Sequence, residues 1–270
     1  MRKFFFLALA AILLAGCSNE REDETINSQK VVLTFSPYEM TAMTRAALTS
    51  SVASRLDVWL VEGSNTTDIH QASTDEDFGT LSVVLNKTKT YTLYAMAHKG
   101  DGAATLSDGV ISFPDDKVKD TFWYTTTFTP STTTSINAAM TRIVAQFRLM
   151  ITDDIPEEVK KVRITLSDVF DRWNVSTGWT HGLDRVSTIS YGGTSSNFSV
   201  FAIVTDAQTT HTVTVDALDN DDAVVKSRTF EDVPLRNGYK TQYQGVFFTD
   251  VSTSATFTVS DWSEYDTVNF

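Results

Sequence analysis

The chain has 270 residues and a formal net charge of −12, from 34 acidic and 22 basic side chains. An acidic chain is a poor match to nucleic acid or to an anionic lipid surface. The length is sufficient for one large domain or two ordinary ones. Cys17 is the only cysteine, so no disulfide framework is available and each domain must be stabilised by its core alone.

The first residues have the pattern of an export signal. Arg2 and Lys3 precede an unbroken run of apolar and small residues, 4–16, which is too short to span a bilayer comfortably. Leu14-Ala15-Gly16-Cys17 resembles the lipobox of bacterial lipoproteins. That resemblance implies cleavage between Gly16 and Cys17 and acylation of Cys17, with chains such as palmitate. Two or more acyl chains hold a protein stably to a membrane. The alternative is an ordinary signal peptide that happens to end in cysteine.

Residues 17–29 are polar and acidic, which predicts an extended, solvated tether. The acidic residues just after Cys17 also resemble the surface-export signal of Bacteroidetes lipoproteins. A plain linker is the alternative interpretation.

Alternating apolar residues predict strands from Lys30 onward. Val31, Leu33 and Phe35 share one face of the first strand. Residues 38–55, which contain Arg45 and Ala46, are expected to be irregular or helical. Further strands of this first half are predicted over 56–60, 81–85, 91–97 and 121–128.

The polar segment 129–135 is the predicted boundary between two domains, 30–135 and 136–270. A short helical turn is expected at Pro156, and 171–196 are expected to form a long loop. Strands of the second half are predicted over 142–151, 162–166, 197–205, 210–218, 222–230, 239–248 and 255–259. Short alternating strands without a long amphipathic helix are typical of antiparallel sandwiches. The sequence therefore predicts an all-β fold of two tandem antiparallel β-sandwich domains.

The layout of the whole chain resembles that of a known family. The lipobox, the first sandwich with Thr44-Arg45-Ala46, and the opening of the second with Met140-Thr141-Arg142-Ile143-Val144-Ala145-Gln146-Phe147 are similar to the fimbrillin-like subunits of Bacteroidetes (type V) pili. The likeness covers essentially the whole mature chain and is greatest to the lipidated FimB-type anchor subunit. It implies two transthyretin-like sandwiches and assembly by donor-strand exchange, in which a strand of one subunit fills a groove in the next.

The resemblance has consequences for individual residues and partners. Residues 30–35 would be the natural occupant of such a groove. In stalk subunits of the family a trypsin-like protease cuts after an arginine in the following loop, here between Arg45 and Ala46, whereas anchor subunits keep their first strand. An ordinary loop arginine is the alternative. The implied location is the surface of the outer membrane, held by the lipid on Cys17. The implied partners are other fimbrial subunits and a host or bacterial surface ligand.

No catalytic constellation is visible in the sequence. The four histidines, His70, His98, His181 and His211, lack neighbours at metal-ligand spacing, and no phosphate loop or dinucleotide fingerprint is present. The acidic run 216–222 offers oxygen ligands for calcium, but a solvated hairpin turn is the simpler interpretation. We therefore expect no enzyme activity, cofactor or metal.

Trp173 and Trp179 are the candidate ligand-contact residues. Exposed indoles flanked by carboxylates and amides can form a sugar-binding platform, because the apolar ring face stacks on a pyranose. The alternative is that both rings plug the end of a sandwich. If the platform existed, the chain would be a surface glycan-binding lipoprotein of a polysaccharide-uptake system, which is the second function that the sequence supports.

Overall fold

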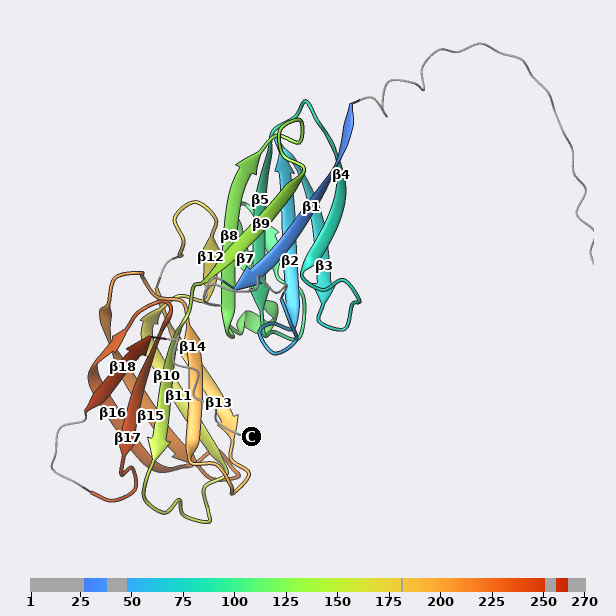
Figure 1. Ribbon diagram of the computed structural model, residues 1–270. Helices are drawn as coiled ribbons and strands as arrows, with labels where there is room; N and C mark the ends of the chain where they lie inside the picture. The colour runs from blue at the N-terminus through green and yellow to red at the C-terminus, as the bar shows by residue number, and fades with distance from the viewer. Residues whose placement is uncertain (1–26, 38–47, 181, 251–255, 262–270) are drawn as a thin grey trace, which may run out of the picture.

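The computed structural model describes residues 27–37, 48–180, 182–250 and 256–261. Figure 1 shows two β-rich domains end to end, with β1 beginning at the pole of the first domain that is farthest from the second. Apart from a three-residue 3-10 turn, Pro114–Asp116, the described part of the chain consists of strands and connecting loops. The predicted all-β class is confirmed.

The first domain is built on one seven-stranded sheet with the order β3-β2-β5-β8-β9-β1-β4. β9 pairs with β1 through its first six residues but with β8 only at Thr141 and Arg142, so the sheet folds over at this strand. The bounds are β1 Ser28–Pro37, β2 Arg55–Glu62, β3 Asn65–Ala72, β4 Thr80–Asn86, β5 Tyr91–His98, β8 Thr121–Phe128 and β9 Ser135–Arg142. The core between the two halves contains the predicted inward face of β1 and the Leu56, Val58 and Leu60 face of β2.

The predicted domain boundary at 135 is wrong by one strand. Residues 135–142 form β9, whose Ile136, Ala138 and Met140 are buried in the first core. The polar segment before β9 is a loop that returns the chain, since Thr132 N–H and Thr133 N–H both donate to the Thr129 carbonyl at 3.1 Å. The domains instead meet at Ile143 and Val144, which are both buried.

The second domain consists of two four-stranded sheets, β14-β10-β17-β18 and β13-β11-β15-β16. Side chains from both sheets form one core, which includes Phe147, Leu149, Ile164, Val215 and Phe230. The strand bounds are β10 Ala145–Ile151, β11 Lys161–Val169, β13 Leu183–Ser190, β14 Asn197–Ala202, β15 Thr209–Leu218, β16 Val224–Leu235, β17 Tyr239–Gly245 and β18 Phe257–Asp261.

The segment 171–196 is not the long loop that we expected, because it contains β12 (Arg172–Asn174) and β13. In β13 the alternation is inverted: Arg185 is buried whereas Val186 is 58 % exposed. The sequence pattern does not predict β3, because its residues are mostly exposed and lack apolar alternation. At Pro156 the chain forms a turn closed by Val159 N–H and the Pro156 carbonyl, at 3.0 Å, in place of the expected helical turn.

Met140→Ala should destabilise the first domain. The Met140 side chain is 0 % exposed in the first core, and truncating a buried methionine costs about 2–5 kcal/mol of the free energy of unfolding. Denaturant titration with hydrogen exchange should show faster exchange in β1 and β5 than in β11. Asn137→Ala, on the exposed face of the same strand, is the matched control. Unchanged exchange in the first domain would restore the boundary at 135.

The Asp153 carboxylate fixes the loop that follows β17. It accepts hydrogen bonds from the backbone N–H groups of Phe247, Phe248 and Thr249 at 2.8, 2.8 and 2.7 Å. Partial burial acts to raise the pKa of Asp153, but the hydrogen bonds from Phe247 and Thr249 act against it, so that the pKa lies below its ordinary value. A carboxylate with a lowered pKa stabilises the fold above the pKa of the unfolded chain, and this contribution is lost as the pH falls through the folded pKa.

Asp153→Asn should therefore lower the free energy of unfolding at neutral pH by about 1.5–3 kcal/mol, the range for hydrogen bonds to a charged group. The difference from the unsubstituted chain should shrink as the pH falls below about 4. Thermal unfolding of both proteins between pH 7 and pH 2.5 provides the measurement. The neighbouring exposed Asp154→Asn is the control. A difference that stays constant over this range would contradict the assignment.

Candidate functional site

The first strand is the element that the fold places most distinctively. β1 lies between β4, to which it is antiparallel, and β9, to which it is parallel. Val31, Leu33 and Phe35 are each 0 % exposed, although β1 is the first described strand of the chain. Figure 1 shows it running along the whole first domain toward the second. Removing β1 would leave a gap between β4 and β9 and open the core.

Main-chain bonds hold β1 to the segments on both sides of it. Val32 N–H donates to the Thr134 carbonyl at 3.0 Å, and Phe35 N–H donates to the Gly79 carbonyl at 2.9 Å. The Phe35 carbonyl accepts from Leu48 N–H at 3.0 Å, so the chain rejoins the body of the domain at Leu48. The predicted cleavage residues Arg45 and Ala46, like Gly16 and Cys17, lie outside the described residues.

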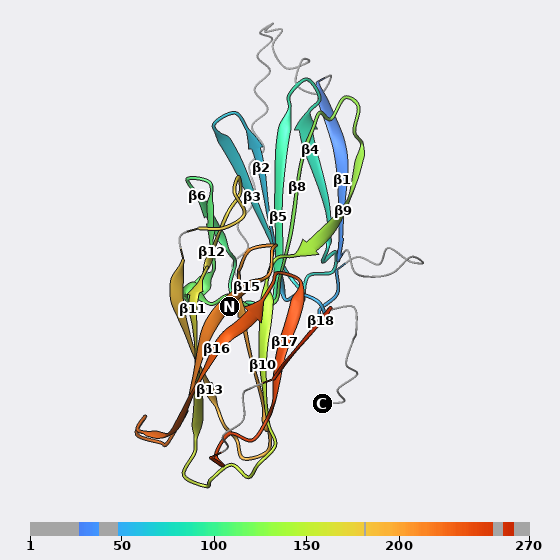
Figure 2. The same ribbon diagram turned by 90° about the vertical axis from the view of Figure 1, so that its left-hand side faces the viewer.

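Trp173 is part of the junction between the domains. It lies on β12, which pairs with β7 (Val110–Ser112), and β7 pairs with β6 (Thr105–Ser107). A strand of the second domain thus completes a three-stranded sheet with a hairpin of the first (Figure 2). The Trp173 ring is 7 % exposed and lies 5.8 Å from the ring of Trp123. It is packed into an apolar cluster shared by both domains.

Trp179 and Trp173 do not form an open platform. The Trp179 side chain is 38 % exposed and stacks on Phe170, with 6.5 Å between ring centroids and an interplanar angle of 21°. Because Trp173 is buried, the two indoles do not offer two open faces to a sugar. For Trp173, the structure agrees with the reading in which the ring plugs the end of a domain.

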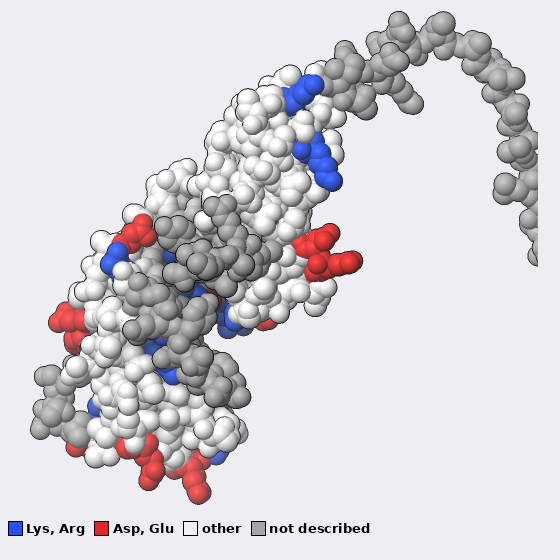
Figure 3. Space-filling model, in the orientation of Figure 1, with Lys and Arg blue, Asp and Glu red and all other residues white. Residues whose placement is uncertain are grey.

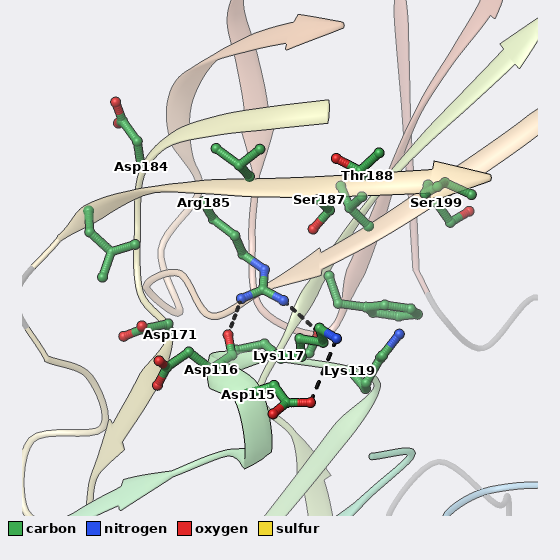
Figure 4. Close-up of a pocket in the computed structure, with 16 residues that line it drawn as sticks. Asp115, Asp116, Lys117, Lys119, Asp171, Asp184, Arg185, Ser187, Thr188 and Ser199 are labelled. Atoms are coloured by element: carbon green, nitrogen blue, oxygen red, sulfur yellow. Dashed lines mark hydrogen bonds and ion pairs between the residues drawn. The ribbon is translucent and has the colours of Figure 1, made fainter. Parts of the chain in front are cut away.

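A cavity of about 500 Å³ lies between the domains, next to this junction. Figure 4 shows residues of the loop 115–119 facing β13 and Ser199 of β14. Its polar lining combines carboxylates, lysines and hydroxyls, including Asp171, Asp184, Lys119, Ser187 and Ser199. Charges of both signs and the lack of an assembled nucleophile and base in this lining give it no recognisable catalytic chemistry.

Arg185 joins the two domains across this cavity. From β13 its two terminal nitrogens donate to the carbonyls of Asp116 and Val118, at 2.8 and 3.1 Å (Figure 4). Burial lowers the pKa of Arg185, while Asp171 and Asp116 act in the opposite direction. A guanidinium remains charged at neutral pH. The sequence does not predict that Arg185 is buried, because Asp184 and Val186, its neighbours in the edge strand, are both exposed.

The structure also contains a buried network around Asp57, which we did not expect from the sequence. The Asp57 Oδ2 accepts from His98 Nε2 at 2.9 Å and from Ala104 N–H at 2.8 Å, and its Oδ1 lies 2.7 Å from His70 Nδ1. Gly100 N–H donates to His98 Nδ1 at 3.0 Å, which leaves the proton on Nε2. The network ties β2 to β3, β5 and the loop before β6. Its signal in the sequence is an aspartate within a strand that is otherwise apolar.

The acidic run 216–222 forms the end of β15 and the turn that follows it. Asp216 is paired with Arg163 at 2.7 Å, and Asp219 Oδ1 accepts from the N–H groups of Asp221 and Ala223, both at 2.9 Å. Among the described residues, no three histidine, cysteine or acidic side chains are grouped so that they could hold a metal ion. Within the same residues, no helix has the length and apolar character needed to span a bilayer.

Sequence comparison gives two matches. Residues 103–267, more than half of the chain, match the family described as "Family of unknown function (DUF6562)". The chain belongs to this family. The matched region begins before β6, so it includes all three strands of the junction sheet as well as the second domain. Residues 1–18 match the lipid attachment site of prokaryotic membrane lipoproteins. No curated protein sequence matches the chain.

Solved structures share the fold at low identity. A candidate adhesin from Bacteroides ovatus is 12 % identical, with a TM-score of 0.53 over 86 % of this chain and 96 % of the other. Candidate polysaccharide-binding proteins from Bacteroides thetaiotaomicron are represented at 9 % identity and a TM-score of 0.53, over 87 % and 96 %. The fimbrial anchor protein Mfa2 from Porphyromonas gingivalis has a TM-score of 0.48 at 10 % identity, over 87 % and 98 %. At these identities the likeness concerns the fold.

The two tryptophans should differ strongly on substitution. Trp173→Ala should lower the free energy of unfolding by about 3–5 kcal/mol, because it removes a buried indole from the domain junction. Trp179→Ala should stay within about 1 kcal/mol, because the ring is partly exposed and packs on one aromatic neighbour. Denaturant titration followed by intrinsic fluorescence measures both. Equal effects of the two substitutions would contradict the assigned burial.

Proposed function

We propose that this chain is a lipid-anchored fimbrial subunit at the surface of the outer membrane, closest in type to the FimB-type anchor, which attaches or caps a polymer by β-strand complementation and supports adhesion. In this proposal its two domains are transthyretin-like sandwiches, its partners are other fimbrial subunits, and it performs no catalytic turnover. The observation that carries the proposal is the position of β1, a buried N-terminal strand that is inserted between β4 and β9.

The geometry of β1 suits a strand that can be exchanged. Its main-chain groups pair with strands on both sides, and its buried side chains Val31, Leu33 and Phe35 fill pockets at alternate positions. These are the two components of recognition by strand addition, in which main-chain bonds give affinity and alternate pockets give register. The described body resumes at Leu48, so cleavage after Arg45 would separate β1 from the rest of the chain.

The position at which β1 begins supports anchoring. The match to a lipid attachment site ends at Ser18, and β1 begins at the pole remote from the second domain (Figure 1). Residues 17–27 would extend at most about 35–40 Å. A lipid on Cys17 would therefore hold the first domain near the membrane, with the second domain free to point away from it. The structural likeness to a candidate adhesin agrees with this arrangement at the level of fold.

The glycan-binding alternative has lost the observation on which it depended. It required Trp173 and Trp179 to be exposed side by side, and Trp173 is buried in the domain junction. We therefore do not extend the proposal to a sugar ligand.

The test is the intact mass of the native protein in membranes and in sheared surface filaments. We expect a lipidated mass that begins at Cys17 in the membrane fraction, because an anchor keeps its first strand. Cys17→Ser should release the protein from membranes. A lipid-free mass that begins at Ala46 in filaments would instead assign a shaft or tip position and make Arg45 the processing site.

Arg45→Ala is the matched control for processing. It should leave the membrane-bound mass unchanged apart from the substitution if the chain is an anchor. Lipidated protein without any filament association would overturn the fimbrial role, and membrane retention of Cys17→Ser would overturn the lipid anchor.

A further inference from the structure

The outer edge of β4 is an unprotected strand edge. β4 is the last strand of the seven-stranded sheet, and beyond it no strand pairs among the described residues. Its seven residues, Thr80–Asn86, include no charged residue and no proline. Natural edge strands are generally protected from pairing by charges, prolines or bulges. Here Val84 is 70 % exposed on the outer face.

Four other edge strands, β3, β13, β16 and β14, differ from β4. β3 carries the exposed Asp68 and His70, and β13 contains Asp184 and Arg185. β16 contains four charged residues and a proline. The edge of β14 is uncharged, but Ser199 and Phe201 line the cavity between the domains. The free edge of β4 lies on the outer side of the first domain (Figure 1).

The hydrogen-bond register shows which groups of β4 are free. Phe35 N–H bonds to the Gly79 carbonyl, and the register continues with Leu33 opposite Leu81 and Val31 opposite Val83. Because antiparallel pairing alternates, Leu81, Val83 and Leu85 direct their main-chain groups to β1. The residues between them direct theirs to the open edge; these are Thr80, Ser82, Val84 and Asn86.

The two ends of this edge are already occupied. Thr80 N–H donates to the Asp77 carbonyl at 2.8 Å, and the Thr80 carbonyl accepts from Gln71 Nε2 at 3.1 Å. Asn86 N–H donates to the Tyr91 hydroxyl at 3.2 Å, and its carbonyl accepts from Lys89 N–H at 3.2 Å. In the described part of the chain, this leaves the N–H and carbonyl groups of Ser82 and Val84 as the four free edge groups.

We infer that this edge pairs with the same edge of a second copy of the chain, antiparallel about a two-fold axis at Val83. In that register Ser82 of one copy lies opposite Val84 of the other, so the four free groups of each copy are matched by the four of its partner. An isologous contact requires such self-complementarity. The pairing would also place Val84 of each copy beside Ser82 of the other on the outer face.

Charge supports a second copy as the occupant. β4 is preceded by the exposed Asp75, Glu76 and Asp77 and followed by Lys87 and Lys89. Figure 3 shows acidic side chains and basic side chains separated along this side of the first domain. Antiparallel pairing places the basic end of one copy beside the acidic end of the other, with Lys89 level with Asp77. Lys89 is also within 3.1 Å of Glu62 of its own chain.

The contact is short compared with the roughly 1,200–2,000 Å² buried in a stable interface, so we expect a weak dimer that covalent trapping reveals. The test uses the mature-length chain with Cys17→Ser, which has no other cysteine. One preparation carries Ser82→Cys and a second carries Val84→Cys. Both positions are exposed, so neither change threatens folding. Mixed and mildly oxidised, they should form a disulfide between the two variants.

The controls are register-specific. Each variant alone should cross-link at least about tenfold less. In the proposed register residue 82 of one copy lies two positions along the strand from residue 82 of the other. Their Cα atoms are then farther apart than the roughly 7 Å that a disulfide spans. Adding Val84→Lys to the Ser82→Cys chain should likewise reduce trapping by about tenfold, whereas Val224→Lys on β16 should not. Equal trapping with and without Val84→Lys, or equal trapping of mixed and single variants, would overturn the inference. The inference would also be overturned if the chain stayed monomeric and Val84→Lys weakened its binding to another filament subunit.

Discussion

The apolar cluster around Trp59 and Trp173 joins the two domains, and much of the structure depends on it. Trp59 reaches it from the outer face of β2, and Trp173 reaches it from β12 of the second domain. β2 is consequently buried on both faces, which is unusual for a strand of an antiparallel sheet with a solvated side. Because Ile143 and Val144 are buried in the same cluster, the link between the domains is itself part of a core. Arg185 and the junction sheet add directional bonds to this contact.

The two domains repeat one arrangement of strands, which shows why β1 differs from its counterpart. In the first domain β1 lies between the antiparallel β4 and the parallel β9, and in the second β10 lies between the antiparallel β14 and the parallel β17. β10 follows β9 through the two buried residues of the domain link. The covalent connection of β1 to the rest of the first domain runs only through residues 38–47. Of the two equivalent strands, β1 is therefore the one that can be replaced without cutting the connection between the domains.

Predictions from the sequence succeeded where burial follows simple alternation. Val31, Leu33 and Phe35 define β1, and the opposed faces of β2 follow from Leu56 and Val58 on one side and Trp59 on the other. Prediction failed where contacts between distant parts of the chain decide which residues are buried. The polar loop 129–135 resembles a linker because its side chains are short and polar, although β9 follows it in the same sheet. The polar neighbours of Trp173 left a ligand platform and a plugging ring as open alternatives, because the hairpin that covers it is more than 60 residues earlier in the chain. Arg185 is buried through contacts with carbonyls 67 and 69 residues away.

The energetics of β1 constrain how such a strand could be exchanged. Burial of an aliphatic or phenylalanine side chain contributes about 1.5–3 kcal/mol, so Val31, Leu33 and Phe35 together contribute on the order of 5–9 kcal/mol. This is comparable with the about 5–15 kcal/mol that stabilises a whole domain. Loss of β1 would also leave the main-chain groups of β4 and β9 without partners along the gap. A first domain without β1 would therefore be only marginally folded until another strand took its place. Cleavage of the chain would in this case permit exchange without driving it, and the incoming strand would supply the stability that the departing one removes. A chain that keeps β1, as an anchor would, is already complete in this domain and has no gap to offer there.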